Sequence, residues 1–491
     1  MYKMHFYSFL IIIFFLFSFI HIPYIAKGFI HSSDQNAPDL IVFNGTIITM
    51  ENSQPEVEAV AISGDKFTEI GNKTNILALA GSKTVLLDLK GRTLLPGFID
   101  AHSHWIGDRN LVEQGSPNEA IKSAISNGWT SISELFVNEE RLNELRSLDQ
   151  ENNIRIRVNA YLPLSWQFER FGDWYKSYQP RYEYSSLLRI AGVKLFMDRW
   201  IGNTTQLYFN QSELTNLVQD AFDSGYQVAI HSVTENATDI VLNVYEDMLA
   251  GRTNDLYRFR IEHLVELRDD QILRLKNLGI IASFQFPWFN SDYESGLVAV
   301  DFNPENLHLL ARWRDLLDVG VQSMGSTDYP WSDGPIGSSI EAIYQAVTRI
   351  GRLGNTPADW MMNQTITVKQ ALRLLTIDAA YGTFQENVKG SIKEGKFADF
   401  VILSENPLIT PLEKFMNIEI LSTRIGAIPE FCSNGSEELC SDLLLSSSTS
   451  TMSLSSKSLT TSSPVTSPIH IEIIIMVLLS LSIINQLKRK K

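Results

Sequence analysis

Basic side chains are in deficit in this chain of 491 residues. Lysine and arginine together number 41, against 56 aspartates and glutamates, so the formal net charge is −15 and the isoelectric point is near 5.1. No basic patch stands out that could neutralise phosphates, which argues against a nucleic-acid partner. The sequence also contains no Gly-x-Gly-x-x-Gly turn, the loop with which a dinucleotide-binding sheet approaches a pyrophosphate.

Cysteine is scarcer still, because Cys432 and Cys440 are the only two in the chain. They stand in a polar segment with seven residues between them. Two cysteines this close allow one local disulfide, which an oxidising compartment would favour, and two free thiols are the alternative.

An apolar run near the start of the chain is typical of a targeting segment. Phe9–Ile20 is apolar and follows Lys3 and His5. Small residues at Ala26 and Gly28 then have the spacing of a cleavage site, as in a secretory signal peptide. We predict a signal peptide over residues 1–28, with an uncleaved signal-anchor as the alternative.

The other end of the chain also departs from globular composition. We predict a stalk over residues 429–468, because 446–468 are mostly serine and threonine with some proline and such a segment builds no core. Residues 469–491 form a hydrophobic tail that ends in four basic residues. Its apolar run, Ile473–Leu487, is about 15 residues long, against ~20 for a full membrane span.

Two forms of membrane attachment fit this tail. Small residues, a spacer and an apolar tail are the layout of a GPI signal, whereas a basic end is typical of the cytoplasmic flank of a transmembrane helix. We therefore predict a secretory-pathway protein held at the cell surface or in a membrane by this tail, with its folded part lumenal or extracellular. Candidate glycosylation sequons on that route begin at Asn44, Asn72, Asn203, Asn210, Asn236, Asn363 and Asn434.

Short β-like segments occur on both sides of the central region. Leu40–Phe43 and Thr46–Met50 flank a predicted turn at Asn44-Gly45, and further short segments continue to Leu95. A similar pattern returns at Phe400–Leu403. Closely spaced strands with glycine and asparagine turns predict a sandwich, so we expect residues 38–95 and 385–428 to build one small composite β-sandwich domain.

Strand-like and helix-like segments alternate between these two ends. Eight strands alternating with helices over about 230 residues predict a (β/α)₈ TIM barrel, which we place at residues 96–384. An open doubly wound sheet is the alternative. The predicted strands are Phe98–His102, Ser131–Leu135, Ile154–Tyr161, Val193–Met197, Val228–His231, Phe259–His263, Ile280–Phe284 and Gln322–Gly325.

Four of the nine histidines fall at the ends of predicted strands. His102 and His104 form a His-x-His pair after the first strand, and alternate residues of a strand point to the same side. His231 ends the fifth strand and His263 the sixth. Active sites of TIM barrels lie at the C-terminal ends of the strands, and three or more such ligands with an open position make a catalytic metal site.

A lysine and an aspartate stand on the same predicted rim. Lys194 on the fourth strand is costly to bury unless it is paired, so it either forms a salt bridge to Asp198 or is a carbamylated lysine that bridges two metal ions. Asp328 either caps a helix after Pro330 or takes a proton from metal-activated water and passes it to a leaving group. Tryptophans that could wall a substrate pocket nearby are Trp105, Trp200, Trp288 and Trp331.

Four blocks of sequence contain most of the candidate site residues: Leu95–His104, Gly192–Asp198, Arg260–His263 and Thr327–Pro330. Two further blocks, Thr367–Leu372 and Lys389–Phe400, follow them in the chain. Together they resemble the amidohydrolase superfamily and, within it, amidohydrolase family 3, the N-substituted formamide deformylase-like metal-dependent hydrolases. The resemblance covers about residues 38–428. It implies a metal-dependent barrel clasped by a β-sandwich from both chain ends.

The resemblance also implies roles for individual residues and a cofactor of one or two divalent ions, with zinc expected. Metal ligands would come from every strand end noted above, with Lys194 carboxylated and bridging, and Asp328 would be the catalytic acid/base as well as a ligand. The implied ligands are His102 and His104 for one ion, His231 and His263 for a second or shared ion, and Asp328.

Two departures from the family pattern leave the substrate open. The segment from His104 to Gly128 lacks the family's long insertion, and Arg199 stands where the family has glycine. We expect a hydrolase of non-peptide carbon–nitrogen bonds, such as those of amides or N-acyl amines, acting on a small molecule. An esterase or lactonase on the same site, or a catalytically retired surface binding protein, is the alternative. The sequence leaves the oligomeric state undetermined.

Overall fold

The computed structural model describes residues 36–112, 114–201, 204–294, 304–332 and 337–440. Within these ranges no helix combines the length and the apolar character that crossing a membrane requires. The predicted signal segment over residues 1–28 and the predicted tail over residues 469–491 lie outside the described residues, as do residues 441–468 of the predicted stalk.

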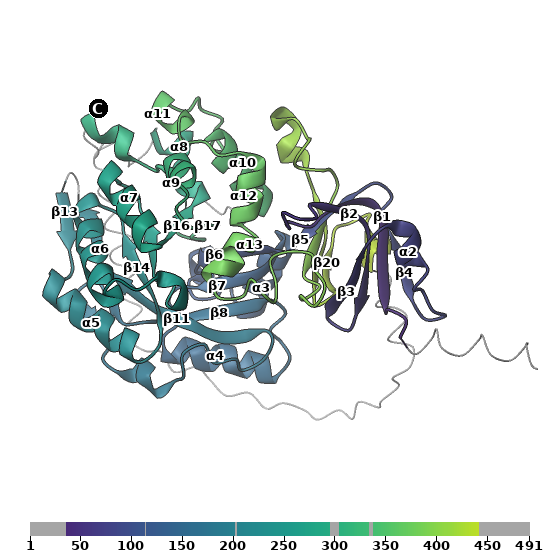
Figure 1. The fold of residues 1–491 in the computed structure, drawn as a ribbon, viewed down its shortest axis with the longest axis horizontal. Coiled ribbons are helices and arrows are strands. Elements are labelled where there is room, and N and C mark those ends of the chain that lie inside the picture. Colours follow the sequence, from purple (N-terminus) through teal and green to yellow (C-terminus); the bar gives the residue numbers. More distant parts are fainter. Residues whose placement is uncertain (1–35, 113, 202–203, 295–303, 333–336, 441–491) are drawn as a thin grey trace, which may run out of the picture. The chain divides into compact units, whose positions relative to one another are not determined.

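Eight parallel strands form the larger of the two main sheets (Figure 1). Each strand pairs with the next one along the chain, from β6 to β17. The two edges meet through backbone hydrogen bonds, because Asp328 N donates to His102 O at 2.8 Å and His104 N donates to Tyr329 O at 2.7 Å. The predicted TIM barrel is confirmed. Its strands are β6 (Phe98–Ser103), β7 (Trp129–Glu134), β8 (Arg157–Pro163), β11 (Leu188–Phe196), β14 (Gln227–Ser232), β15 (Arg260–His263), β16 (Ile281–Gln285) and β17 (Ser323–Ser326).

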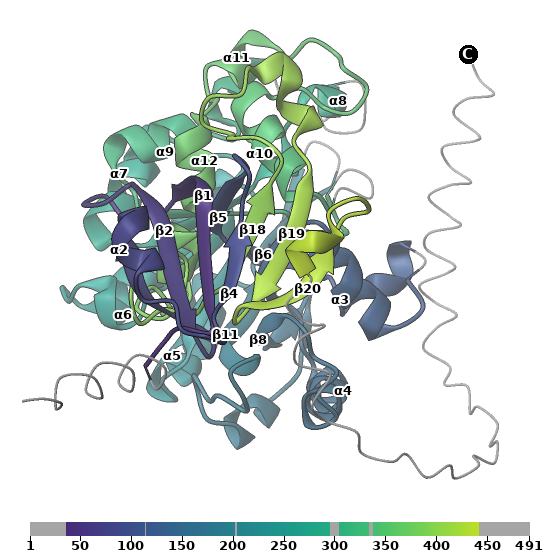
Figure 2. The ribbon, with the colours of Figure 1, turned by 90° about the vertical axis from the view of Figure 1, so that its right-hand side faces the viewer.

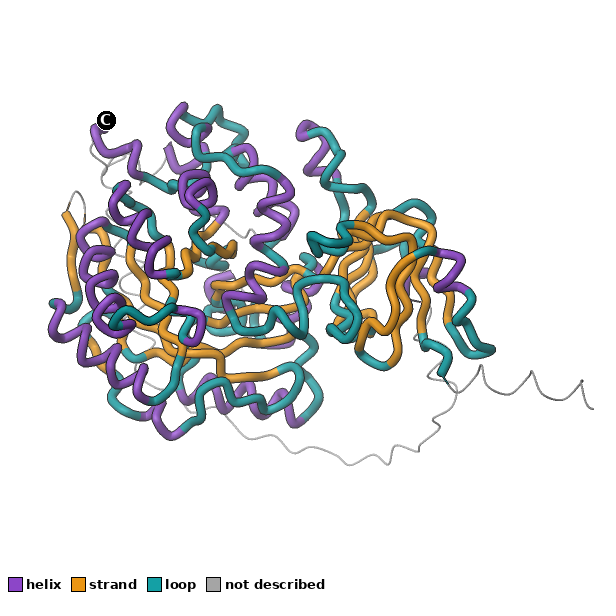
Figure 3. Tube along the Cα trace, in the orientation of Figure 1, coloured by secondary structure: helices purple, strands orange, loops and turns teal. Residues whose placement is uncertain are grey.

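Helices surround the barrel strands (Figure 3). In α5 the buried residues are Leu214, Val218 and Ala221, which lie on one helical face, and Asn210 with Glu213 forms a capping box at its start. A small antiparallel ribbon, β9 (Ser165–Trp166) and β10 (Glu169–Arg170), replaces a helix after β8, and β12 (Asp198–Ile201) with β13 (Thr204–Leu207) follows β11. The helices are α3 (Pro117–Ser126), α4 (Glu139–Gln150), α5 (Gln211–Asp223), α6 (Glu235–Leu249), α7 (Asp269–Leu278), α8 (Ser291–Glu294), α9 (Trp313–Val319), α10 (Ser339–Thr348), α11 (Asp359–Met362), α12 (Val368–Leu374) and α13 (Ile377–Gly382).

The smaller domain is a mixed sheet of eight strands from both ends of the described chain (Figure 2). Its core is apolar and includes Val42, Val60, Phe67 and Phe400. The prediction that the two chain ends share one domain is confirmed. In spatial order the strands are β20 (Ile428–Cys432), β19 (Ile420–Ile425), β18 (Phe400–Leu403), β5 (Thr93–Pro96), β1 (Leu40–Ile48), β2 (Glu56–Ser63) and β3 (Lys66–Gly71); β4 (Val85–Asp88) also pairs with β1, and the short helix α2 (Lys73–Leu77) follows β3.

The predicted turn at Asn44-Gly45 is wrong, because β1 runs through both residues. The register against β2 shifts between Phe43 and Ile47, and Asn44 adopts a positive φ of 65°. A β-carbon on Gly45 would lie 2.3 Å from Arg92 O, so only glycine fits there. The same residue types that make a hairpin turn here make a bulge, which bends the strand without ending it.

Residues 429–440 belong to the folded sheet, which differs from the predicted stalk boundary. They include most of β20, and Leu439 is buried in the core of the sheet. Cys432 and Cys440 are joined in a disulfide that closes this last segment on itself.

Buried polar contacts join the sheet to the barrel. Asp399, just before β18, accepts from Arg157 Nε at 2.6 Å and from Arg157 Nη2 at 2.8 Å, and both side chains are buried. Thr423 on β19 donates from Oγ1 to Ile125 O at 2.8 Å. The sheet therefore supports the end of the barrel at which β8 begins.

Candidate metal centre

The barrel brings the predicted site residues to the C-terminal ends of its strands. This follows from the parallel arrangement, in which every strand ends on the same rim. His231 is partly exposed and the other five side chains are buried. The site residues are His102 at the end of β6, His104 just after it, Lys194 in β11, His231 in β14, His263 at the end of β15 and Asp328 after β17.

The Asp328 carboxylate lies at the centre of this group. Its Oδ1 is 3.3 Å from His102 Nε2 and 3.4 Å from His104 Nε2. The ligand atoms of His102, His263 and Asp328 all lie within 4.8 Å of one another. The His231 ring is 4.3 Å from the His263 ring, centroid to centroid, so the fourth histidine adjoins the same cluster.

Protonation states in the cluster favour a cation between the side chains. Burial lowers the pKa of His231 and of His263 well below the usual range, and neighbouring positive groups add to the effect. Both rings are then neutral at pH 7, which is the form that binds metal. Burial alone would raise the pKa of Asp328, but His102 and His104 hold it well below its usual value.

Lys194 is buried and its Nζ has no hydrogen-bond partner among the described residues. Burial lowers the pKa of this amine to about 8. The alternative of a salt bridge to Asp198 is not realised, because that carboxylate accepts from Val233 N and Thr234 N, each at 2.9 Å, and from Thr234 Oγ1 at 2.7 Å. Its Nζ lies over the Phe196 ring, 4.8 Å from the ring centroid, and an amine without a hydrogen-bond partner leaves room for a further group.

The alternative role of Asp328 as a helix cap is also not realised within residues 329–332, which form a turn. Asp328 itself has a positive φ of 57°, an uncommon conformation for a residue with a side chain. Its N–H is used in closing the barrel, and its carboxylate faces the histidines. Strain of this kind at a buried carboxylate is typical of a functional site.

The described residues fit a divalent metal ion. Neutral imidazole nitrogens and an ionised carboxylate are donors that Zn²⁺ and related ions bind. Three buried nitrogen atoms in the group, His104 Nδ1, Lys194 Nζ and His263 Nδ1, have no hydrogen-bond partner within the ranges that the structure describes. Orphaned donors of this kind are rare in a folded protein unless something else occupies the site.

Two glutamates support the cluster and were not predicted. Glu262 Oε2 lies 2.6 Å from His102 Nδ1. Glu134 at the end of β7 accepts from Ile106 N at 2.8 Å and from Gly107 N at 3.0 Å, and so holds the segment that follows His104. Glu262 carried a sequence signal, since it alternates with Arg260 along the strand and both therefore face one side.

The tryptophans named from the sequence occupy different environments. Trp105 is buried and stacks on Tyr329 with ring centroids 3.9 Å apart. Trp331 is 51% exposed and donates to Asp108. Trp288 lies beside the cluster, with its ring 4.9 Å from that of His263. The side chain of Trp200 is outside the described part of the structure.

A second group of aromatic side chains adjoins His231 and was not predicted. The Phe196 ring lies 5.4 Å from the His231 ring and 4.8 Å from the Trp166 ring. Phe136 completes the group, 5.6 Å from Trp166, which is 40% exposed. We call these three residues, Phe136, Trp166 and Phe196, the rim aromatic cluster. It offers an apolar and partly accessible surface next to the candidate metal ligands.

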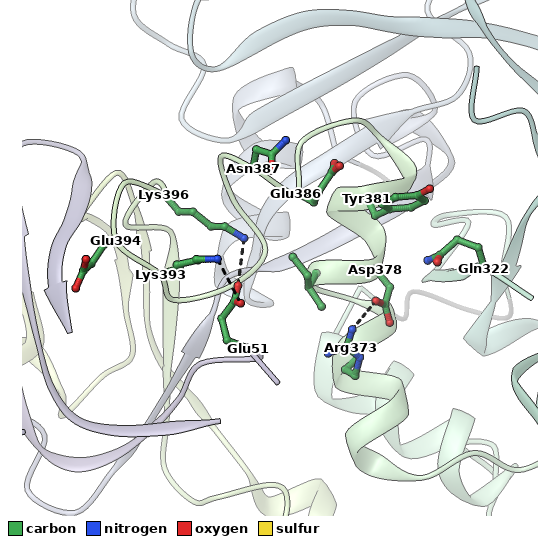
Figure 4. Close-up of a pocket in the computed structure, with 11 residues that line it drawn as sticks. Glu51, Gln322, Arg373, Asp378, Tyr381, Glu386, Asn387, Lys393, Glu394 and Lys396 are labelled. Carbon is green, nitrogen blue, oxygen red and sulfur yellow. Dashed lines mark hydrogen bonds and ion pairs between the residues drawn. The ribbon is translucent and has the colours of Figure 1, made fainter. Parts of the chain in front are cut away.

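A cavity of about 530 Å³ lies away from this rim, near Gln322 at the start of β17 (Figure 4). Its charged groups largely pair with one another, since Arg373 bonds Asp378 at 2.9 Å and Lys396 lies 3.5 Å from Glu51 (Figure 4). It therefore provides no reason to place the chemistry there. Its lining residues are Glu51, Gln322, Arg373, Ile377, Asp378, Tyr381, Glu386, Asn387, Lys393, Glu394 and Lys396.

Comparison with known proteins gives a consistent group of relatives. Residues 112–424 match the model of the amidohydrolase family. Protein LONG AFTER FAR-RED 3 of Arabidopsis thaliana is 23% identical over 79% of this chain and 91% of its own length. N-substituted formamide deformylase of Arthrobacter pascens is 28% identical over 51% of this chain and 47% of its own length. An uncharacterized metal-dependent hydrolase from Pyrococcus horikoshii has the same fold, with a TM-score of 0.64 at 22% identity over 76% of this chain and 99% of its own.

The predicted location in the secretory pathway, at the cell surface or in a membrane, is wrong. The bacterial relatives are named as a deformylase and an amidohydrolase, and neither name designates an exported or membrane-attached protein. The sequons lose their support with it. Asn44 and Asn72 also have local structural roles, since their amides donate to Asp88 at 2.7 Å and to Glu58 at 2.9 Å.

Proposed function

Because this chain belongs to the amidohydrolase family, as its sequence blocks predicted, and is a metal-dependent hydrolase, we propose that it hydrolyses carbon–nitrogen bonds other than peptide bonds. The substrates would be small molecules with an amide or N-acyl group. The observation that supports this best is the cluster of His102, His263 and Asp328, whose ligand atoms lie within 4.8 Å of one another. Nitrogen and carboxylate ligands in this number suit an ion that activates water.

The rim side chains would hold one or two divalent ions, and zinc is the ion we favour because imidazole and carboxylate are its ordinary ligands. When bound, such an ion polarises a carbonyl oxygen and lowers the pKa of a water molecule to about 7. The proposed ligands are His102, His104, His231, His263 and Asp328, with Lys194 bridging once it is carboxylated.

Asp328 would move the proton in this reaction. Its pKa is held well below the usual range against the effect of burial, so the carboxylate is ionised at neutral pH. Its Oδ1 faces the Nε2 atoms of His102 and His104 at 3.3 and 3.4 Å. A proton taken here from the attacking water can be passed to the leaving nitrogen, which must be protonated as the bond breaks.

Lys194 would carry a carboxylate on its amine. Carboxylation joins a neutral amine to CO₂, forms an N–C bond and releases one proton. Burial lowers the pKa of this amine to about 8, so a sizeable neutral fraction exists near physiological pH. The unpartnered Nζ supports this assignment, since the added carboxylate would supply the missing interactions.

The rim aromatic cluster would receive the apolar part of the substrate. Phe196 adjoins His231 at 5.4 Å, so a group bound against these rings would lie next to the reacting carbonyl. Aromatic walls with a few polar groups are typical of small-molecule sites. We therefore favour amides whose nitrogen or acyl group bears an apolar substituent.

A panel of amides, esters and lactones, assayed with metal-loaded protein, tests the proposal. Turnover of amides above that of matched esters supports carbon–nitrogen specificity. Turnover of esters or lactones alone would show that the enzyme hydrolyses carbon–oxygen bonds instead. A metal-loaded protein that is inert on the whole panel would favour the retired binding protein and contradict the proposed activity.

A further inference from the structure

Glu262 occupies a buried position next to the candidate metal centre. It lies on β15 with no exposed surface, and its Oε2 is 2.6 Å from Nδ1 of His102. The distance is that of a strong hydrogen bond to a charged acceptor. The two residues are 160 positions apart in the sequence, so the barrel fold is what brings them together.

Arg260 holds the Glu262 carboxylate in place. It contacts both oxygens, with Nη2 donating to Oε2 at 2.8 Å and Nε donating to Oε1. The guanidinium is fixed in turn, because Nη2 also donates to Ala101 O at 2.8 Å and Nη1 donates to Tyr161 Oη at 3.1 Å. A buried ion pair with its remaining donors satisfied has a defined geometry.

The contact sets which nitrogen of His102 is free. An ionised carboxylate can only accept hydrogen bonds, so His102 Nδ1 carries the proton toward Glu262. The other nitrogen, Nε2, is then the one that would hold a metal ion, and it is the atom that lies 3.3 Å from Asp328 Oδ1. Histidine ligands commonly donate their second nitrogen to such a carboxylate, which orients the ring for the metal.

Two of the other rim histidines, His104 and His263, lack an equally firm support, and His231 Nε2 lies 3.8 Å from Oδ1 of the buried Asp198. His104 Nδ1 is 3.5 Å from Asp108, whose carboxylate is 37% exposed. His263 Nδ1 has no hydrogen-bond partner within the described residues. Of the rings of His102, His104 and His263, that of His102 is therefore the one oriented by a fully buried charge.

We propose that Glu262 is a positioning residue that fixes the His102 ring with Nε2 toward the metal, and that Arg260 holds Glu262 for this purpose. The proposal rests on the proposed metal site. In this proposal Glu262 raises the affinity for the metal by orienting His102, and it is not itself a metal ligand. The prediction is that loss of the Glu262 charge weakens metal binding more than it weakens the fold.

The test measures the affinity of the full-length apoprotein for Zn²⁺ by competition with a chromophoric chelator, and the visible spectrum of its Co²⁺ form. We expect Glu262→Gln to weaken Zn²⁺ binding by about 10- to 100-fold and to change the Co²⁺ spectrum. Glu262→Asp keeps the charge at a shorter reach and should lie between wild type and Glu262→Gln. If Glu262→Gln does not fold, Glu262→Asp provides the test in its place.

Asp399→Asn is the matched control. It removes the carboxylate of another buried Arg pair, with Arg157 at 2.6 and 2.8 Å, but this carboxylate contacts no candidate ligand. We expect it to lower thermal stability while leaving Zn²⁺ affinity within about twofold. Equal affinities in Glu262→Gln and wild type, or equal losses in Glu262→Gln and Asp399→Asn, would overturn the positioning role. Wild-type protein that binds no Zn²⁺ or Co²⁺ would instead overturn the metal site itself.

Discussion

Asp328 is the residue on which the proposed chemistry depends most. Its carboxylate faces two imidazoles and is ionised at neutral pH. We expect Asp328→Asn to retain metal and fold but to lower kcat by about 10²- to 10⁴-fold, since a positioned proton acceptor contributes that much. The control is Asp318→Asn, which changes an exposed carboxylate on α9. Equal turnover in Asp328→Asn and wild type would remove Asp328 from the mechanism.

Lys194 gives a prediction with a defined pH dependence. Carboxylation requires the neutral amine, and burial lowers the pKa of Lys194 to about 8. The neutral fraction therefore rises as pH increases through 8. Apoprotein given Zn²⁺ and the same dissolved ¹³CO₂ concentration at each pH should show a carbamate ¹³C signal that forms faster at pH 9 than at pH 7. The signal should be absent from Lys194→Met, and its persistence there would place the modification elsewhere.

At the residue scale, the rim histidines could be predicted because the signal is local. A histidine at the end of an apolar strand has a known direction once the strand belongs to a parallel barrel. The partner of His102 could not be predicted, because Glu262 meets it only through the closed fold. The salt bridge from Lys194 to Asp198 could be set aside only with the structure, in which the Asp198 carboxylate is bonded to Val233 and Thr234.

At the element scale, Glu134 couples the end of β7 to the segment after His104. Burial raises the pKa of Glu134 to about 7, against a usual 4.5, although backbone N–H donors oppose the shift. The folded protein thus binds a proton more tightly than the unfolded chain. Stability from this group is fully present below pH 4.5 and is lost as pH rises to about 7.

The prediction compares the apoprotein with Glu134→Gln. Relative to that variant, the wild-type free energy of unfolding should fall by about 3 kcal/mol between pH 4.5 and pH 7. Urea titrations at several pH values measure it. Parallel pH profiles for the two proteins would show that Glu134 titrates normally in the fold.

The β9–β10 ribbon places Trp166 against Phe196. We expect Trp166→Ala to raise KM about fivefold for amides with an apolar substituent and to leave small amides nearly unchanged, because a lost aromatic contact is worth about 1 kcal/mol. Phe168→Ala is the matched control, since this 58% exposed ring on the same ribbon contacts Tyr208 instead. Equal effects on both substrate types would contradict a role for the cluster in specificity.

Element boundaries were predicted best where the hydrophobic pattern was long. Most of the eight barrel strands were found because they are apolar runs next to amphipathic helices. The bulge at Asn44 was missed, because a residue that tolerates positive φ fits a hairpin turn and a bulge equally well. The ribbon after β8 was missed because its strands are two residues each.

At the scale of the whole molecule, the Arg157–Asp399 pair joins the two domains. Both side chains are buried. Arg157→Met would leave the Asp399 charge without this partner, so we expect a loss of about 3–5 kcal/mol in the free energy of unfolding. Arg274→Met breaks an exposed pair with Glu246 and should cost less than about 1 kcal/mol. Similar losses in both variants would show that the interface does not depend on this pair.

Both chain ends contribute to one domain, and this could be predicted because similar short strands flank the barrel pattern. The last strand, β20, could not be predicted, since residues 429–440 are polar in composition and enter the sheet through β20 and the disulfide. The predicted location rested only on the composition of the two chain ends, which lie outside the described residues, and the relatives do not support it.

The central claim is that the barrel rim binds a divalent metal through its histidines and Asp328. Elemental analysis of the purified full-length protein tests it most directly. The account predicts at least one tightly bound zinc or similar divalent ion per chain, and a loss of that ion when His102 and His104 are both replaced by alanine. Less than one ion per wild-type chain, or an undiminished content in the double variant, would contradict it.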